Sequence, residues 1–419
     1  MKFLKNSLWM IGDYFAKIFS AIFVGVYIAR YLGPEAYGML SYALAIISIF
    51  IVISKLGMDS ILVRDIANQK EGRSLYVSSA LLLMSAIGFL LYIIACAGIY
   101  LVENDFKVVF AVWVLAGGIL FQSCYVVDYY YQAGFQAKYS AISKSMALLL
   151  SSALKIGAVH FNMDFYIVIW LYMIDHILVA LSLLICFALK NKSDLHFKIK
   201  LGVLGELVRS SWPMVIASLA SILYMRVDQV MIKSILGVEE LGYYAAAIKI
   251  YEGWIIIPMI ICISLLPAIS EKRAGSRGDY EKFMVRIFSG VFWLGIIASL
   301  VAVAFGEAMI ELTFGAEFSR SVEPFIIVML SASFTALGSA TARYLVVEGM
   351  EKKIATRTLL ALCLNVALNY ALIPLYGVSG AAFATFMTIL FSNYLINYFD
   401  SRLVRLRLIC NRAIMLKLS

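Results

Sequence analysis

The chain has 419 residues, of which 63% are apolar and 15% carry a charge, and its formal net charge is +9. A soluble domain of this size needs more charge to cover its surface, so the composition excludes a soluble globular protein. The positive balance does not indicate a nucleic-acid partner either, because no groove-reading motif and no basic and aromatic cluster accompanies it.

Runs of about twenty apolar residues recur along the chain, long enough to cross a hydrocarbon core about 30 Å thick. Backbone amides in lipid must be satisfied within their own segment, so long runs without alternation predict helices rather than barrel strands. The first run is too long for a signal peptide and lacks a small-residue cleavage site, so we expect it to stay in the protein. We expect about twelve transmembrane helices, at about residues 8–30, 38–57, 75–101, 108–127, 142–161, 165–189, 212–235, 242–268, 284–306, 322–345, 355–374 and 378–399.

Lys and Arg are concentrated in alternate loops. If the N-terminus is cytoplasmic, most of them fall on the cytoplasmic side, including Lys144 and Arg357, which we count as loop residues. This asymmetry predicts that both termini are cytoplasmic, and basic loops facing an anionic leaflet explain the positive net charge. The segment 57–74 is expected to lie along the membrane surface as a short amphipathic helix. The opposite side holds only Arg30, Lys107, Lys233 and Arg320.

The stretch LGPEAYGMLSYA at residues 32–43 recurs as LGVEELGYYAAA at residues 236–247. An even number of predicted spans lies between the copies, so both have the same orientation in the membrane. A repeat of about half the chain indicates two parallel six-helix lobes with a central cavity between them, which is typical of transporters. The basic linker at about 190–211 is the natural boundary, giving lobes at residues 1–200 and 201–419. The predicted fold is an all-α integral membrane protein.

The repeated element lies at the outer end of the first span of each lobe. Gly33 and Gly38 bracket a tight turn in which Pro34 blocks helix continuation, and Val238 replaces this proline in the second copy. We expect these turns to build the extracytoplasmic rim rather than the binding site, and Arg30 suits either stabilising the turn or substrate release. The candidate outer-turn residues are Arg30, Gly33, Pro34, Glu35, Gly38, Gly237, Glu239 and Gly242.

Charged residues within predicted spans cost about 2.5–3.5 kcal/mol each on insertion, so we expect them to face the interior and to have a function. Two pairs have helical spacing, Asp13 with Lys17 and Lys249 with Glu252, and each pair can meet on one helix face. The alternative is an ion pair within one helix whose two charges only neutralise each other during membrane insertion. The candidates for the substrate cavity or ion coupling are Asp13, Lys17, Lys155, Arg226, Asp228, Lys249, Glu252 and Arg343.

The other candidates lack such a partner on their own helix. Arg226 and Asp228 are two residues apart and point in different directions, which favours roles in the cavity or at a gate. Lys155 has no acidic residue within a turn on either side, and an uncompensated lysine at that depth favours a water-filled lumen and an anionic ligand. Arg343 lies nearer the inside end of its span, where snorkelling to the interface is an equal alternative.

Motifs for other chemistry are missing from the sequence. The six cysteines form no C-x-x-C pair and are typical of buried small apolar residues. The chain has no H-E-x-x-H motif and no G-x-x-x-x-G-K-[ST] phosphate loop, so we expect no metal, no cofactor and no ATP hydrolysis. The predicted outside loops are short, the longest at about 306–322, which disfavours an extracytoplasmic catalytic segment. We therefore expect a secondary transporter and not an enzyme.

The run IARYLGPEAYG at residues 28–38, followed by LGMDSILVRDIA at 56–67, is similar to bacterial polysaccharide flippases. These are the O-antigen type of lipid-linked oligosaccharide transporter, in the multidrug/oligosaccharidyl-lipid/polysaccharide exporter superfamily. Three further segments extend the resemblance over nearly the whole chain: VDQVMIKSILGVEELGYYAAA at 227–247, FGAEF at 314–318 and YGVSGAA at 376–382. Peptidoglycan-precursor flippases are also similar, but they usually carry fourteen spans.

The resemblance implies movement of an undecaprenyl-pyrophosphate-linked oligosaccharide from the inner to the outer leaflet of the bacterial cytoplasmic (inner) membrane. Such transport serves the synthesis of a surface polysaccharide, O-antigen of lipopolysaccharide or capsule. Members alternate between inward-open and outward-open states, driven by a proton or sodium gradient. Besides membrane lipids, a glycan polymerase and a chain-length regulator are the expected partners.

Two other functions remain as alternatives. A multidrug cation antiporter of the same superfamily should have an acidic lumen, since cationic drugs need carboxylates, and Lys17, Lys155, Arg226 and Lys249 weigh against it. A membrane glycan polymerase is disfavoured by the short outside loops.

Overall fold

The computed structural model describes the backbone of residues 2–68, 73–190 and 200–417, and the side chains of these segments except at positions 2–8, 11, 14–19, 21, 60 and 201. Every regular element in this part of the chain is a helix. By its contacts the chain divides into two compact units. The first comprises Met1–Leu32 and Met39–Ile222, and the second comprises Gly33–Gly38 and Leu223–Ser419.

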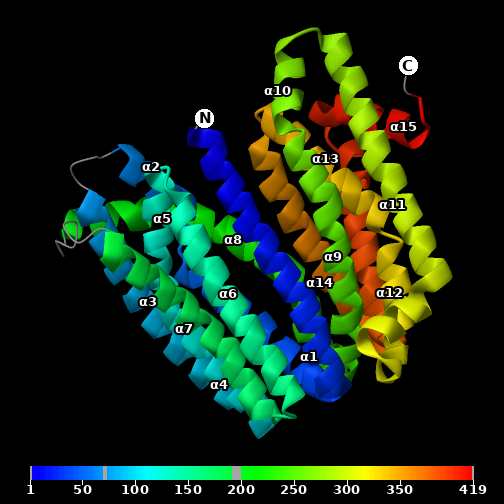
Figure 1. The fold of residues 1–419 in the computed structure, drawn as a ribbon. Helices are drawn as coiled ribbons and strands as arrows, with labels where there is room; N and C mark the ends of the chain where they lie inside the picture. Colours follow the sequence, from blue (N-terminus) through cyan, green and yellow to red (C-terminus); the bar gives the residue numbers. More distant parts are fainter. Residues whose placement is uncertain (1, 69–72, 191–199, 418–419) are drawn as a thin grey trace. The chain divides into compact units, whose positions relative to one another are not determined.

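The first unit is built from helices joined by short turns. α6 packs on α7, α7 on α4, and α4 on α3, so these four helices lie side by side (Figure 1). The short helix α2 occupies most of the segment in which the sequence predicts a surface helix, and it packs on α5 and α3. The elements are α1 (Lys2–Ser54), α2 (Met58–Asn68), α3 (Arg73–Val102), α4 (Phe106–Leu120), η1 (Phe121–Tyr125), α5 (Val126–Ala133), α6 (Ala137–His160) and α7 (Phe165–Lys190).

The division between the units falls inside α8 (Leu201–Leu236). Val203 and Leu207 in its first half belong to a buried apolar cluster with Met58 and Leu62 of α2. Because burying such side chains stabilises the packing of these helices, the first half of α8 groups with the first unit. The boundary predicted between residues 200 and 201 therefore lies before the division that the contacts give.

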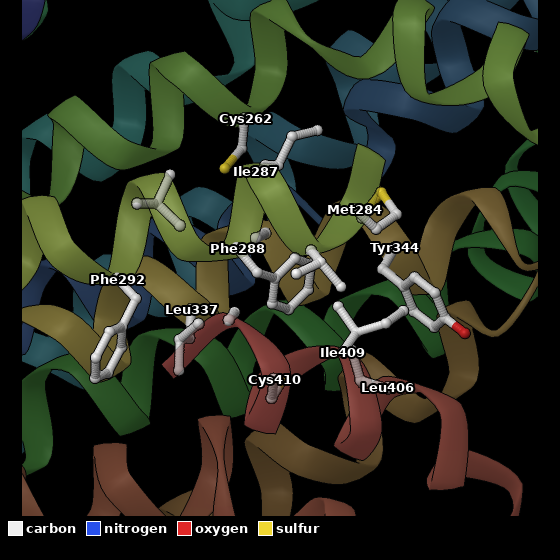
Figure 2. Packing of buried hydrophobic residues seen from close by; sticks show 14 of the residues in the cluster. Cys262, Met284, Ile287, Phe288, Phe292, Leu337, Tyr344, Leu406, Ile409 and Cys410 are labelled. Carbon is white, nitrogen blue, oxygen red and sulfur yellow. The ribbon is translucent and has the colours of Figure 1, made fainter. Parts of the chain in front are cut away.

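The second unit surrounds a core in which α11 packs on α13 and α15, and α13 packs on α9 and α14. Figure 2 shows part of this core, where Phe288 of α11 and Leu337 of α13 lie among Leu406, Ile409 and Cys410 of α15. The buried positions of α15 follow helical spacing, which turns its arginines away from the core. Besides α8, the elements are α9 (Val238–Ser264), α10 (Leu266–Ala274), α11 (Arg277–Phe314), η2 (Ala316–Ser321), α12 (Val322–Met329), α13 (Ala332–Val347), α14 (Glu351–Asn393), η3 (Leu395–Tyr398), η4 (Ser401–Leu403) and α15 (Val404–Ile414).

Many of these helices are long and apolar enough to cross a membrane. Among the described residues there are 9 such helices, or 10 spans if the bent pair formed by η2 to α12 and α13 is one span. α1 breaks at Gly33 and α14 breaks at Gly377, and each of these helices covers two of the predicted spans. With these breaks the observed helices account for the approximate number of predicted spans. The chain is a multi-pass helical membrane protein, as its composition predicts.

Candidate functional site

The two copies of the repeated element form the same backbone turn. Gly33 has φ 71° and ψ 174°, and Gly237 has φ 100° and ψ 179°. These positive φ values suit glycine, which lacks a Cβ atom, so the same residue type interrupts the helix in both copies. Pro34 and Val238 follow at the start of the next helical segment, where a backbone N–H needs no helical partner. Proline and valine are therefore both acceptable there.

The two turns pack directly on each other through their second glycines. A Cβ atom on Gly38 would lie 1.8 Å from the Val238 carbonyl oxygen, and one on Gly242 would lie 1.9 Å from the Pro34 carbonyl oxygen. The contact is reciprocal, because Pro34 and Gly38 hold the same places in the first copy as Val238 and Gly242 hold in the second. A side chain at either glycine would push the turns apart. The segment Gly33–Gly38 accordingly groups with the second unit.

The charged residues of the outer turns lie near the surface. Arg30 and Glu35 are exposed. Glu239 accepts a hydrogen bond from the Tyr243 hydroxyl at 2.8 Å. The rim role of these residues stays a prediction.

A buried cluster of three charged side chains lies in the first unit. The Lys144 ammonium lies 2.7 Å from a carboxylate oxygen of Asp128 and 3.0 Å from one of Asp13. All three side chains are less than one tenth exposed. The Lys144 ammonium is thus close to two buried carboxylates. The sequence identified Asp13 only, and the side chain of its expected partner Lys17 lies outside the described residues.

The assignment of Lys144 to a loop, made when basic residues were counted by loop, was wrong. The residue lies within α6 and is buried, although the sequence analysis assigned it to a cytoplasmic loop. A lysine followed by small and apolar residues marks either a loop end or a buried ion pair, and only the partner helix decides between them. Asp128, at the inside end of a predicted span, was the available signal.

Lys155 also has a partner that the sequence analysis did not find. Its ammonium pairs with the Asp175 carboxylate of α7, which in turn accepts a hydrogen bond from the Ser151 hydroxyl. The ammonium lies 4.0 Å from the ring centroid of Tyr172, which adds a cation–π contact. The inference that Lys155 is uncompensated is therefore corrected, because its carboxylate comes from the neighbouring helix and not from its own. Its assignment to a substrate cavity stays a prediction.

The predicted charges of the second unit lie on α8 and α9. Arg226 donates a hydrogen bond to Glu252 at 3.1 Å, and both side chains are about one quarter exposed. The buried Asp228 carboxylate accepts hydrogen bonds from the Tyr244 hydroxyl at 2.5 Å and from the backbone N–H of Gln229 at 2.7 Å. Asp228 and Arg226 thus have separate partners, as their spacing predicts.

The contacts of two further candidates are less well defined. Lys249 lies on α9 and is half-buried, three residues before Glu252, whose carboxylate binds Arg226. Arg343 lies on α13, is half-buried, and its Nε has no hydrogen-bond partner among the described residues. The roles predicted for both residues stay predictions.

A cavity of about 250 Å³ lies inside the second unit. Its walls come from α8, α9, α13 and both halves of α14, and they include two predicted residues, Asp228 and Glu252. The cavity also contains the Arg357 side chain, which the sequence analysis counted as a loop residue. The other polar residues of the walls are Tyr224, Tyr251, Thr335, Thr341, Thr358, Asn365, Thr385, Ser392 and Asn393.

Comparisons with known proteins identify relatives along most of the chain. A family model described as "Polysaccharide biosynthesis protein" matches residues 3–273. The capsular polysaccharide biosynthesis protein CapF of Staphylococcus aureus is 23% identical, over 94% of this chain and 98% of its own length. A protein of Shigella flexneri named as an O-antigen transporter is 21% identical, over 96% of this chain and 99% of its own length.

Solved structures of two transporters have a similar fold. An inward-facing multidrug resistance MATE family transporter of the MOP superfamily matches with a TM-score of 0.76 and 14% identity, and the match covers 94% of each chain. The lipid II flippase MurJ in an inward closed conformation matches with a TM-score of 0.75 and 14% identity, over 98% of this chain and 91% of MurJ. At these identities the likeness concerns the fold, and it confirms the predicted helical transporter fold.

Proposed function

Because the chain belongs to the Polysaccharide biosynthesis protein family, we propose that it is a flippase for a lipid-linked oligosaccharide. The substrate is an oligosaccharide repeat unit on undecaprenyl pyrophosphate, and it moves from the inner to the outer leaflet of the bacterial cytoplasmic membrane. There it serves the synthesis of a surface polysaccharide, with a glycan polymerase and a chain-length regulator as partners. The names of the two relatives, one capsular and one O-antigen, support this substrate class.

The observation that carries this proposal is the polar cavity of the second unit. A lipid-linked oligosaccharide has an anionic, hydroxyl-rich head group and an apolar tail. The head group needs polar space among the spans, whereas the tail can remain in lipid. Asp228, Glu252 and Arg357 line a cavity within helices long and apolar enough to span a membrane. Ionised side chains at such positions are costly and mark substrate or ion pathways.

Ion coupling fits the buried carboxylates of both units. The carboxylates of Asp13 and Asp128 both contact the Lys144 ammonium, so binding of a proton or a sodium ion to either carboxylate would change the charge balance of this cluster. Asp228 is a second buried carboxylate with defined hydrogen-bond donors. An ion bound more tightly in one conformation than in the other shifts the equilibrium between the inward-open and outward-open states.

Complementation of a strain that lacks this gene tests the function. Loss of the gene should cause lipid-linked repeat units to accumulate inside the cell, and the intact gene should restore the surface polysaccharide. The variants Lys155→Ala and Arg226→Ala should abolish complementation while membrane insertion stays normal. Full complementation by both variants would contradict their role in transport. Changed drug resistance with a normal surface polysaccharide would instead favour the multidrug antiporter.

A further inference from the structure

Arg357 is a buried cation that forms no ion pair with a carboxylate among the described residues. Its side chain is 8% exposed, and its Nη2 donates a hydrogen bond to the side-chain oxygen of Asn397. The Nε and Nη1 groups have no hydrogen-bond partner among the described residues, and no ion pair to the guanidinium is found there. Lys353, one turn earlier on α14, does pair with Asp400. The Asp400 carboxylate thus binds Lys353 directly and acts on Arg357 only at longer range.

An uncompensated guanidinium at this depth is energetically unfavourable. Taking a single charge out of water costs several kcal/mol even after relaxation, and unsatisfied N–H groups add to this cost. Such a cost is acceptable where a ligand supplies the missing charge and acceptors. Arg357 lines the cavity of the second unit, whose volume of about 250 Å³ is many times what a single water needs. The space beside the guanidinium therefore admits a small polar group.

The groups around Arg357 are mainly hydrogen-bond donors or amphoteric. Thr341 of α13 also lines the cavity, and its buried hydroxyl has no partner among the described residues. Asn393 enters the wall beside Gly338, where a Cβ atom would lie 2.6 Å from the Asn393 carboxamide. Unpartnered donors that line one cavity favour a ligand that presents several acceptor oxygens.

The two carboxylates that line the cavity are bound by donors other than Arg357. Glu252 binds Arg226, and Asp228 accepts hydrogen bonds from Tyr244 and from the Gln229 backbone. Neither contacts the guanidinium in the described part of the chain. Both acidic groups thus have their own donors, while two nitrogens of Arg357, Nε and Nη1, have no acceptors among the described residues.

We propose that the cavity of the second unit is an anion subsite in which Arg357 binds a phosphate group of the transported lipid. The planar guanidinium presents N–H groups in a fork that matches phosphate oxygens, and the Thr341 hydroxyl adds a donor. The identification of this phosphate as part of the pyrophosphate linkage rests on the proposed function. The anion site itself rests on the unpartnered atoms and the cavity.

Binding of farnesyl pyrophosphate to the purified full-length protein in neutral detergent tests the subsite. Arg357→Gln should weaken the affinity at least about tenfold, because a hydrogen bond to a charged group contributes about 1.5–3 kcal/mol. Arg357→Lys keeps the charge but loses the fork, so we expect an intermediate loss. Thr341→Val, which preserves shape, should weaken binding severalfold. Arg402→Gln, at an exposed position outside the cavity, is the matched control and should bind like the wild type.

Competition identifies the source of the phosphate. Inorganic pyrophosphate should compete with the probe, and phosphatidylglycerol added to the micelles should not. Equal competition by phosphatidylglycerol would overturn the assignment to the transported lipid in favour of a bulk-lipid headgroup. Unchanged binding by both Arg357→Gln and Thr341→Val would overturn the subsite.

Two controls separate folding and function from binding. Thermal unfolding of Arg357→Gln should occur at or above the wild-type temperature, because the substitution removes an uncompensated charge. If this variant unfolds early, Arg357→Lys and Thr341→Val decide the question. A wild-type protein that binds the probe but does not complement the surface polysaccharide would contradict the proposed flippase and leave the anion subsite standing. Normal complementation by Arg357→Gln would overturn the subsite alone.

Discussion

Lys144 and Lys155 of the first unit each lie against carboxylates, whereas Arg357 of the second unit lies against a cavity. All three residues are buried on helices of apolar composition, so each must offset a similar cost of leaving water. In the first unit, the carboxylates beside the two lysines offset this cost. In the second unit two nitrogens of Arg357, Nε and Nη1, have no partner among the described residues, and this difference indicates where a ligand can contribute most.

The largest expected effect is the loss of the shared cation in the first unit. Lys144→Met would leave Asp13 and Asp128 buried without their ammonium, and we expect the free energy of unfolding to fall by about 3–5 kcal/mol. Thermal unfolding of the detergent-solubilised protein, followed by intrinsic fluorescence, measures this change. Adding Asp128→Asn to Lys144→Met should recover part of the loss, because one buried charge disappears. Wild-type stability of the single variant would contradict the buried cluster.

A smaller loss is expected at the second lysine. After Lys155→Met, Asp175 keeps the hydrogen bond from Ser151 and its side chain is 28% exposed, so solvent can take over part of the stabilisation. We expect a loss of about 1–2 kcal/mol in the same unfolding experiment. Lys155→Arg keeps the charge and serves as the control. A loss as large as that of Lys144→Met would show that Asp175 is less accessible to water than its exposure indicates.

Local rules of sequence were sufficient for most of the fold. Runs of apolar residues predicted the spans, and glycines at equivalent places in the repeat predicted the turns at Gly33 and Gly237. Each of these signals depends only on residues that are close together in the sequence. That Gly38 and Gly242 contact the opposite turn could not be predicted, since a close approach depends on the position of another segment. The same limit applies to the division inside α8, which is set by which helices its first half contacts.

The candidate site was predicted less well because ion pairs join different helices. Glu252 was expected to pair with Lys249 on its own helix, but the structure places Arg226 beside it. Asp13 contacts Lys144 of another helix, a partner that its own helix could not indicate. Arg357 was missed because a basic residue near the end of a span has the same sequence signature as a loop residue. Only its burial and its unpartnered atoms distinguish it.

Variants of Arg226 and Glu252 separate the effect of their ion pair on stability from the effect of charge in the cavity on ligand binding. Both side chains are partly exposed, so Arg226→Gln should cost no more than about 1 kcal/mol of stability. The variant removes the cation that contacts the Glu252 carboxylate at the cavity, so farnesyl pyrophosphate should bind severalfold more weakly. Glu252→Gln removes that negative charge and should bind at least as well as the wild type. Weaker binding by Glu252→Gln would argue against charge as the cause.

The smallest effect is expected at the pair that neutralises the cation next to Arg357. The hydrogen bond from Lys353, together with the backbone N–H of Arg402, holds the pKa of Asp400 below its usual value. The folded protein therefore has a lower Asp400 pKa than the unfolded chain, whose value is about 3.9. Between the two pKa values the unfolded chain binds a proton that the folded protein does not. The pair thus stabilises the fold fully above the unfolded pKa, and this contribution is lost as the pH falls through the folded pKa. Asp400→Asn keeps the side-chain acceptor for the Arg402 N–H but loses the charge. Its unfolding temperature should therefore be lower than that of the wild type by on the order of 1 °C at pH 6, and the difference should vanish in acid. If the two unfolding temperatures still differ at a pH below the folded pKa, Asp400 stabilises the protein through packing and not through its charge. The ion pair with Asp400 would then not be what distinguishes Lys353 from Arg357.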